Sequence, residues 1–334
     1  MEDVNAKKIE SVIKSHLQQG SYFCLRDNIR FKPKENSLDN KEESVQLLIA
    51  NGMLPLEDIF LVATIHSLGD ATPPIILRKL ALEKRRNPEQ AIPFFDLRTL
   101  KWRLKLLVKH GLLYSFSYDI GDEDTSVVIY RCTMLGWRVF KTRLMQNIAF
   151  DKLAHYRSTS DTLRKLAANA VAYSFAGNDL CKSVILNETV TYGESNRPAK
   201  INLYARTSLE NEHTKRRYII EPTFFLVEKE ITTEEQNESR IDERLSQLQT
   251  YIEERIEKDA WDVRLVLVVE NLDGLQKLLA LIKRKDMNFF MQYAIFTAEN
   301  IIANNNYSLS TSFLKMAIVR GKNTIKLDCE SILS

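Results

Sequence analysis

The sequence has few of the residues that define several common protein classes. Its 334 residues include only 4 cysteines, 10 glycines and 8 prolines. The cysteines lie far apart and form no CxxC pair, which argues against a zinc site or a disulfide framework and favours reduced thiols. Low glycine and proline contents argue against a disordered or fibrous chain. The cysteines are Cys24, Cys132, Cys181 and Cys329.

Long apolar runs are also missing. Residues 263–269 form one of the longest, and this run is interrupted by Arg264 and far shorter than the ~20 residues that cross a bilayer. Residues 1–17 carry acids and lysines in an amphipathic pattern, without the apolar core of a signal peptide. We therefore expect a cytoplasmic protein with no membrane segment.

Several motifs for cofactors and catalysis are absent. The sequence contains no GxxxxGK[ST] loop, no GxGxxG motif and no GxSxG motif. Its histidines have no cysteine or acid at the spacing of metal ligands. From these absences we expect that the protein has no cofactor and no metal ion. The histidines are His16, His66, His110, His155 and His213.

The length favours two domains, because single cores rarely grow beyond about 250 residues. Hydrophobic residues make up 44% and charged residues 27% of the chain, with a net charge of +3. The charge is uneven, since Leu54 to Gln146 contains 14 Lys and Arg against 10 Asp and Glu. The chain as a whole is therefore no polycation, but one segment has a cationic surplus.

Residues 51–146 are predicted to form a winged helix. Apolar residues cover most of the circumference of a helix at Leu56–Ser67, and Thr72 with Pro73 can begin the next helix. After a third helix, alternating strands at Leu113–Tyr118 and Val127–Cys132 predict a β-hairpin. The order of helix, helix, basic helix and hairpin is that of a winged helix.

The third helix lies within Asp96–Leu113, where Asp96 is a good N-cap and Gly111 a left-handed C-cap. Its apolar stripe is Leu97, Leu100, Leu104, Leu107 and Val108. The other side holds cations and no acid, a pattern that suits the major groove of DNA. A run of cations at the end of the preceding helix can add phosphate contacts. The predicted DNA-binding residues are Arg98, Lys101, Arg103, Lys105, Lys109, Lys84, Arg85 and Arg86.

Two features of this segment leave other interpretations open. The hairpin tip is acidic, with Asp119, Asp122, Glu123 and Asp124, so it faces either away from DNA or toward a protein partner. Trp102 and Trp137 lie beside apolar stripes and are predicted to belong to the core.

A second domain is predicted from buried strands that alternate with helices, which favours an α/β sheet. Helices are expected at Asp161–Phe175, after Thr232 and at Leu275–Ile282. Strands are expected at Ser183–Leu186, Lys200–Ala205, Arg217–Val227, Val263–Glu270 and Phe289–Phe296. The predicted organisation is an N-terminal helix and polar linker at 1–50, the winged helix at 51–146, a helical connector at 147–180 and the α/β domain at 181–334.

The segments KLLVKHGLLYSFSY and CTMLGWRVFK, followed by a helical connector and an α/β domain, resemble the replication-relaxation (MobMN-like) family of Gram-positive plasmids and integrative elements. The resemblance covers about residues 50–300. It implies a winged helix joined to a domain of the PD-(D/E)XK, restriction-endonuclease-like fold. Residues 220–224, Ile-Glu-Pro-Thr-Phe, stand where that fold carries its Pro-Asp pair, so the nuclease motif is broken here.

An active nuclease of this type needs an acid and a lysine two residues apart on one strand face. The only such triplet, Asp39 to Lys41, lies in a polar stretch. Glu188, Glu221 and Glu228 around Lys200 are the alternative set of ligands. We therefore expect no enzyme, and a metal-dependent nuclease is the alternative.

The sequence thus favours a double-stranded DNA-binding protein of a mobile genetic element, acting in replication, transfer or transcriptional control. A winged-helix module that binds only proteins is a further alternative. A homodimer is expected if the DNA site is palindromic.

Overall fold

The computed structural model of the chain describes residues 32–33, 41–119, 126–144, 149–150, 159–193, 198–212, 215–224, 234–258, 261–269, 272–284, 288–298, 314–319 and 324–329. It is a mixed α+β structure with two sheets. Residues 26–162 form one compact unit, here the N-terminal unit. Residues 163–334 belong to a second, the C-terminal unit, so the division falls inside the predicted connector.

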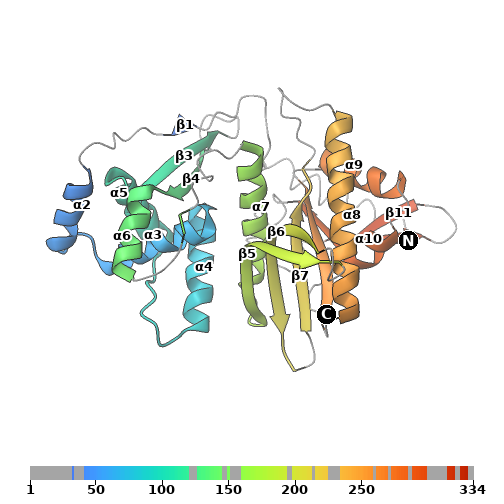
Figure 1. Cartoon of the computed structure of the whole chain (residues 1–334), viewed down its shortest axis with the longest axis horizontal. Coiled ribbons are helices and arrows are strands. Elements are labelled where there is room, and N and C mark those ends of the chain that lie inside the picture. The colour runs from blue at the N-terminus through green and yellow to red at the C-terminus, as the bar shows by residue number, and fades with distance from the viewer. Residues whose placement is uncertain are drawn as a thin grey trace. The chain divides into compact units, whose positions relative to one another are not determined.

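The N-terminal unit places its helices around a small antiparallel sheet of order β1-β3-β4-β2 (Figure 1). Strands β3 and β4 pair from Leu113 with Cys132 to Asp119 with Ser126, as the predicted hairpin requires. The two-residue strand β2 adds to β4 on its other side. The elements are β1 Lys32–Pro33, α2 Lys41–Ala50, α3 Leu56–Leu68, β2 Asp70–Ala71, α4 Pro73–Arg86, α5 Leu97–Lys109, β3 Leu113–Asp119, β4 Ser126–Cys132 and α6 Met134–Leu144.

A buried ion pair joins β2 to β4. Arg131 Nε and Nη2 donate to the two carboxylate oxygens of Asp70 at 2.6 and 3.0 Å, and Asp70 is fully buried. The Arg131 guanidinium also lies 5.0 Å from the Phe116 ring on β3. Because the two oxygens are both satisfied in bidentate geometry, this pair can be buried at little net cost.

Helix α6 closely approaches the connection between α5 and β3 at Gly136. A Cβ at this position would overlap the backbone carbonyl oxygen of Leu112. That carbonyl accepts a hydrogen bond from the Thr133 N–H at 3.1 Å, and the Gly136 N–H donates to the Thr133 hydroxyl at 2.9 Å. The glycine is therefore required by close packing.

The C-terminal unit is built on a seven-stranded sheet of order β11-β10-β9-β8-β7-β6-β5. Strands β5, β6 and β7 pair antiparallel, β7, β8 and β9 pair parallel, and β9, β10 and β11 pair antiparallel. The elements are α7 Thr159–Phe175, β5 Cys181–Tyr192, β6 Ala199–Glu210, β7 Lys215–Pro222, α8 Glu234–Lys258, β8 Asp262–Val269, α9 Leu272–Arg284, α10 Asn288–Tyr293, β9 Ala294–Ala298, β10 Leu314–Val319 and β11 Thr324–Cys329.

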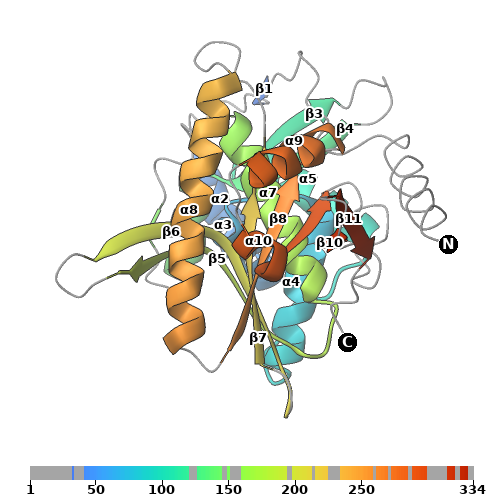
Figure 2. The same ribbon diagram turned by 90° about the vertical axis from the view of Figure 1, so that its right-hand side faces the viewer.

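Helices α8 and α9 cover one face of this sheet (Figures 1 and 2). Leu245, Leu248 and Ile252 project from α8 at helical spacing and are fully buried. They pack with alternate residues of β8, including Leu265 and Leu267. Side chains that recur every 3.6 residues in the helix and every 2 residues in the strand thus pack into one core.

Two expectations for this unit were wrong. The segment Phe289–Phe296 is not one strand, because α10 occupies 288–293 and β9 begins at Ala294. Phe290 is buried from the helix, and the rings of Phe289 and Tyr293 stack at 4.8 Å. The strand expected at Arg217–Val227 ends at Pro222. The sheet is mixed, with β10 and β11 at one edge that the pattern did not predict.

Among the described residues, no helix has the length and apolar content needed to span a membrane.

Candidate nucleic-acid interface

Helix α5 is delimited by the two caps that the sequence predicts. The Asp96 carboxylate accepts hydrogen bonds from the Thr99 backbone N–H at 2.8 Å and from the Thr99 hydroxyl at 2.7 Å. These bonds, the backbone one first, lower the pKa of Asp96. At the other end, Gly111 adopts a φ of 74° that favours glycine. Both caps are local, so the length of α5 is set by its own sequence.

The rotation of α5 about its axis is fixed by burial of one face. Leu100, Leu104 and Leu107 are completely buried. Their spacing of four and three residues makes a narrow stripe. Leu97, predicted in the same stripe, is instead 42% exposed, and Val108 is half-buried. The face opposite the stripe is therefore turned to solvent.

The exposed face carries a row of cations. Arg98, Lys101, Lys105 and Lys109 are all exposed, and at 100° per residue they lie within about 80° of one another around the axis. The helix contains no acidic residue. Four positive charges thus lie in line over three turns, with no acid on the helix to neutralise them.

Arg103 differs from these four. It lies on another side of α5, where Nη1 contacts the Asp58 carboxylate of α3 at 3.1 Å. Asp58 is fully buried. Desolvation raises the pKa of Asp58, and the Arg103 charge opposes that rise. Arg103, predicted to contact DNA, is therefore engaged in an ion pair between α3 and α5.

Trp102 was expected in the core, and this prediction is wrong. Its side chain is 57% exposed and lies at the edge of the cationic face, one helical turn from Arg98 and from Lys105. The guanidinium carbon of Arg103 lies 5.1 Å from the centre of its ring. Helical spacing alone places residue 102 beside residues 98 and 105, and this signal was available. Trp137 is half-buried, with its ring 5.6 Å from that of Phe150.

The segment before α5 adds exposed aromatic and basic groups. Phe94 is 83% exposed, and Lys84 Nζ lies 5.7 Å from the centre of its ring. Arg85 and Arg86 end α4 and are exposed as well. The N-terminal unit thus carries two sets of predicted DNA-binding cations, one on α5 and one at the end of α4.

Most of the acidic hairpin tip lies outside the described residues. Asp119 ends β3, while Asp122, Glu123 and Asp124 lie outside the described residues. Their predicted orientation away from DNA stays a prediction.

In the C-terminal unit, arginines pair with two of the acids of the alternative nuclease site. Arg244 Nε and Nη2 donate to Glu221 at 2.9 and 2.8 Å, and Arg206 binds both oxygens of Glu188 at 2.7 and 2.8 Å. Burial raises the pKa of Glu221, against the effect of Arg244. Lys200 is exposed on β6, and Glu228 lies outside the described residues.

A metal ion at Glu221 would have to displace the Arg244 guanidinium from both carboxylate oxygens. Among the described residues, no three His, Cys, Asp or Glu side chains are grouped so that they could hold a metal ion. The acids predicted as alternative ligands are therefore not brought together in the part of the chain that the structure describes.

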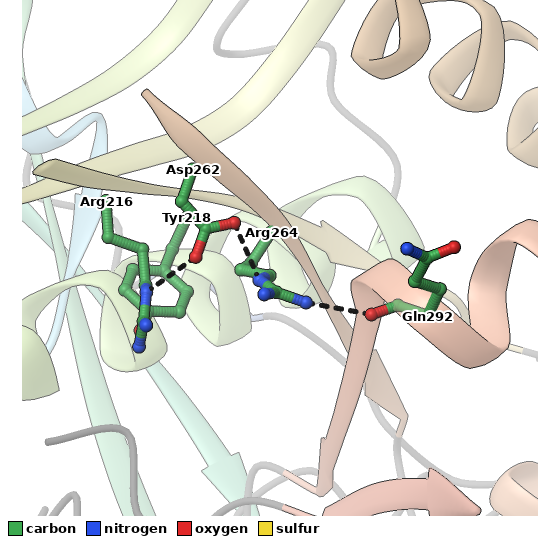
Figure 3. Close-up of polar contacts among 5 residues, drawn as sticks. All are labelled: Arg216, Tyr218, Asp262, Arg264 and Gln292. Atoms are coloured by element: carbon green, nitrogen blue, oxygen red, sulfur yellow. Dashed lines mark hydrogen bonds and ion pairs between the residues drawn. The ribbon is translucent and has the colours of Figure 1, made fainter. Parts of the chain in front are cut away.

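A second polar cluster lies where the parallel strands β7 and β8 begin. Figure 3 shows the Asp262 carboxylate between two arginines, with Arg216 Nε at 2.9 Å from one oxygen and Arg264 Nε at 2.9 Å from the other. Arg264 Nη1 also donates to the Gln292 carbonyl of α10 at 2.8 Å. The cluster joins two strands and α10, and both Asp262 oxygens have an arginine partner.

No protein family model and no curated protein matches the chain. Among solved structures, the chain is similar to protein VC1899 from Vibrio cholerae, with a TM-score of 0.30 and 13% identity. The alignment covers 82% of this chain and 56% of that protein, so the chain spans little more than half of its length. At this TM-score the similarity carries no argument about fold or function.

Proposed function

We propose that the chain binds double-stranded DNA through helix α5 and that residues 51–146 act as a winged helix. The observation that carries the proposal is the row of four exposed cations on α5, Arg98, Lys101, Lys105 and Lys109, with no acid on the helix. A solvated helix face normally mixes both signs of charge, and this face does not.

The order of elements supports the same proposal. Helix α3, strand β2, helices α4 and α5 and the hairpin β3–β4 follow one another, and β2 pairs with β4. In this arrangement α5 takes the position of the recognition helix, which enters the major groove. The groove is about 12 Å wide and accepts one α-helix.

The dimensions of the cationic row fit a DNA backbone. From Arg98 to Lys109 the helix rises about 16 Å, at 1.5 Å per residue. Duplex DNA carries one negative charge for about every 1.7 Å of its axis, so each of the four cations has phosphates within reach. The end of α4, with Lys84, Arg85 and Arg86, adds charge to the same unit.

The biological process is proposed from the resemblance to the replication-relaxation family. On that basis the chain acts in replication, transfer or transcriptional control of a mobile genetic element. A palindromic DNA site would be bound by a homodimer, whose two recognition helices occupy half-sites one helical turn apart.

Binding to a fluorescent 30-bp duplex at low salt, followed by anisotropy, tests the proposal. We expect Lys101→Gln with Lys105→Gln to weaken binding by about 10- to 100-fold, since two phosphate contacts are lost. The matched control is Lys182→Gln with Lys200→Gln, which removes the same charge from exposed positions of the C-terminal unit. This control is expected to bind like the wild type.

Two other outcomes have definite meanings. Absence of duplex binding by the wild-type protein would contradict the proposal and favour a module that binds only proteins. Equal weakening by both double variants would indicate a general charge effect and would reject α5 as the interface.

A cleavage assay tests the nuclease alternative. Incubation of supercoiled plasmid with Mg²⁺ is expected to give no nicking, and nicking that Glu221→Ala abolishes would establish the nuclease alternative.

A further inference from the structure

We propose that Trp102 is a stacking residue and that the DNA recognised by α5 contains unpaired bases, as at a locally opened duplex. This inference rests on the proposed function and names the structural class of its DNA ligand. It starts from one observation, a tryptophan that is 57% exposed beside the cationic row, about one helical turn from both Arg98 and Lys105.

Trp102 is held in place by an internal chain of contacts. Buried Asp58 on α3 binds Arg103 at 3.1 Å, and the Arg103 guanidinium lies 5.1 Å from the Trp102 ring centre. A cation over an indole ring is attracted by the electrons of the ring. Because Asp58 holds the guanidinium and the guanidinium contacts the ring, the ring is supported outside the apolar core. A ring that is ordered before binding loses less entropy on binding.

The charges around Trp102 point to nucleic acid as the occupant. Arg98, Lys101 and Lys105 lie on the same face, and α5 contains no acid. The core of a protein–protein interface is depleted of charged residues, and of lysine in particular. An aromatic ring set among cations is instead the combination that binds single-stranded nucleic acid, where cations follow the backbone and bases stack on the ring.

An intact duplex offers little to such a ring. Its major groove exposes base edges, whose apolar group is the thymine methyl, while the faces of the bases are stacked on their neighbours. An unpaired base presents a whole face. Phe94, 83% exposed just before α5, is a second aromatic ring on the same unit, with Lys84 beside it. Duplex flanks retain the phosphates for the cationic row, and an opened segment supplies the base for Trp102.

The test compares two fluorescent probes of equal length, a duplex and the same duplex with a central unpaired bubble. The proteins are the wild type, Trp102→Leu, which removes the flat ring, and Trp102→Phe, which retains one. We expect the wild type to prefer the bubble by about tenfold, the order of one stacked base. Trp102→Leu is expected to bring that ratio close to one, and Trp102→Phe to keep most of the preference.

A spectroscopic measurement tests the stacking itself. With Trp137→Phe and Trp261→Phe, Trp102 is the only tryptophan, since the chain has 3. Its fluorescence is expected to be quenched by the bubble more strongly than by the duplex. If the wild type binds both probes equally, or if Trp102→Leu leaves the preference intact, the inference is wrong and DNA binding by α5 stands. If neither probe is bound, the proposed function itself fails.

Discussion

The salt dependence of DNA binding can be calculated from the residues on α5. Arg98, Lys101, Lys105 and Lys109 are exposed on one face, so α5 alone offers four phosphate contacts. Each contact contributes about 0.9 to the slope of log K against log salt, which gives a slope of about −3.6. An increase from 50 to 200 mM salt should then weaken binding by about 150-fold. Alanine at Arg98, Lys101 or Lys105 should change the slope to about −2.7.

Arg103→Ala is the matched control, because it removes one positive charge from the same helix. Arg103 is paired with buried Asp58, so we expect the slope to stay at its wild-type value. The unfolding free energy should instead fall by about 3 kcal/mol, since Asp58 is left buried without its counter-ion. Fluorescence anisotropy at four salt concentrations and urea denaturation measure the two effects. A slope for Arg103→Ala as shallow as that for Lys101→Ala, or shallower, would refute the assignment of the two faces.

Three further predictions concern stability, each measured by urea or thermal denaturation. Asp70→Asn should lower the unfolding free energy by about 3 kcal/mol, because Arg131 loses its buried counter-ion. Replacing both partners leaves no unpaired charge, so a double Asp70→Leu, Arg131→Leu variant no more stable than the single Asp70→Leu or Arg131→Leu variant would contradict this. Gly136→Ala should cost about 3 kcal/mol through overlap with the carbonyl of Leu112, and wild-type stability would show that this contact is loose. Asp96 has a lowered pKa in the folded state, so its stabilising effect is present above the ordinary carboxyl range and lost as the pH falls through that lowered pKa. Asp96→Ala should therefore lower the midpoint most at neutral pH, and a difference that grows toward acid pH would exclude the cap.

Local signals predicted much of the N-terminal unit. Asp96 and Gly111 delimit α5 as expected, because caps depend on residues within one turn of the helix end. The hairpin was found because alternation of apolar and polar residues has a period of two. The four exposed cations were predicted from helical spacing, which also depends only on near neighbours.

Contacts between distant segments were not predicted. Arg103 pairs with Asp58, 45 residues earlier. Helical spacing places Arg103 on a different side of α5 from the other cations, but no pattern within α5 identifies its partner. Trp102 was assigned to the core from the usual behaviour of aromatic residues, although its spacing placed it with Arg98 and Lys105. For Phe289–Phe296 the apolar run fitted a strand and a buried helix equally well, and the packing of Phe290 decides between them.

In the C-terminal unit, too, a contact between distant residues was not predicted. The broken motif around Glu221 was visible in the sequence, but the partner of this acid was not. Arg244 comes from α8, 23 residues later, and binds both carboxylate oxygens. Such a bidentate pair depends on how α8 lies on the sheet, which short-range patterns do not determine.

The uniform charge of α5 also affects the free protein. Lys101 and Lys105, and Lys105 and Lys109, are spaced four residues apart, and each such like-charged pair destabilises a helix by about 0.2–0.5 kcal/mol. Added salt screens this repulsion, so the ions that weaken binding of a polyanion also stabilise the unbound helix. A bound polyanion relieves the same repulsion and raises the melting temperature of the unit by mass action. The repulsion among the lysines of α5 in the free protein is thus relieved when phosphates bind, and this relief adds to the affinity for the polyanion.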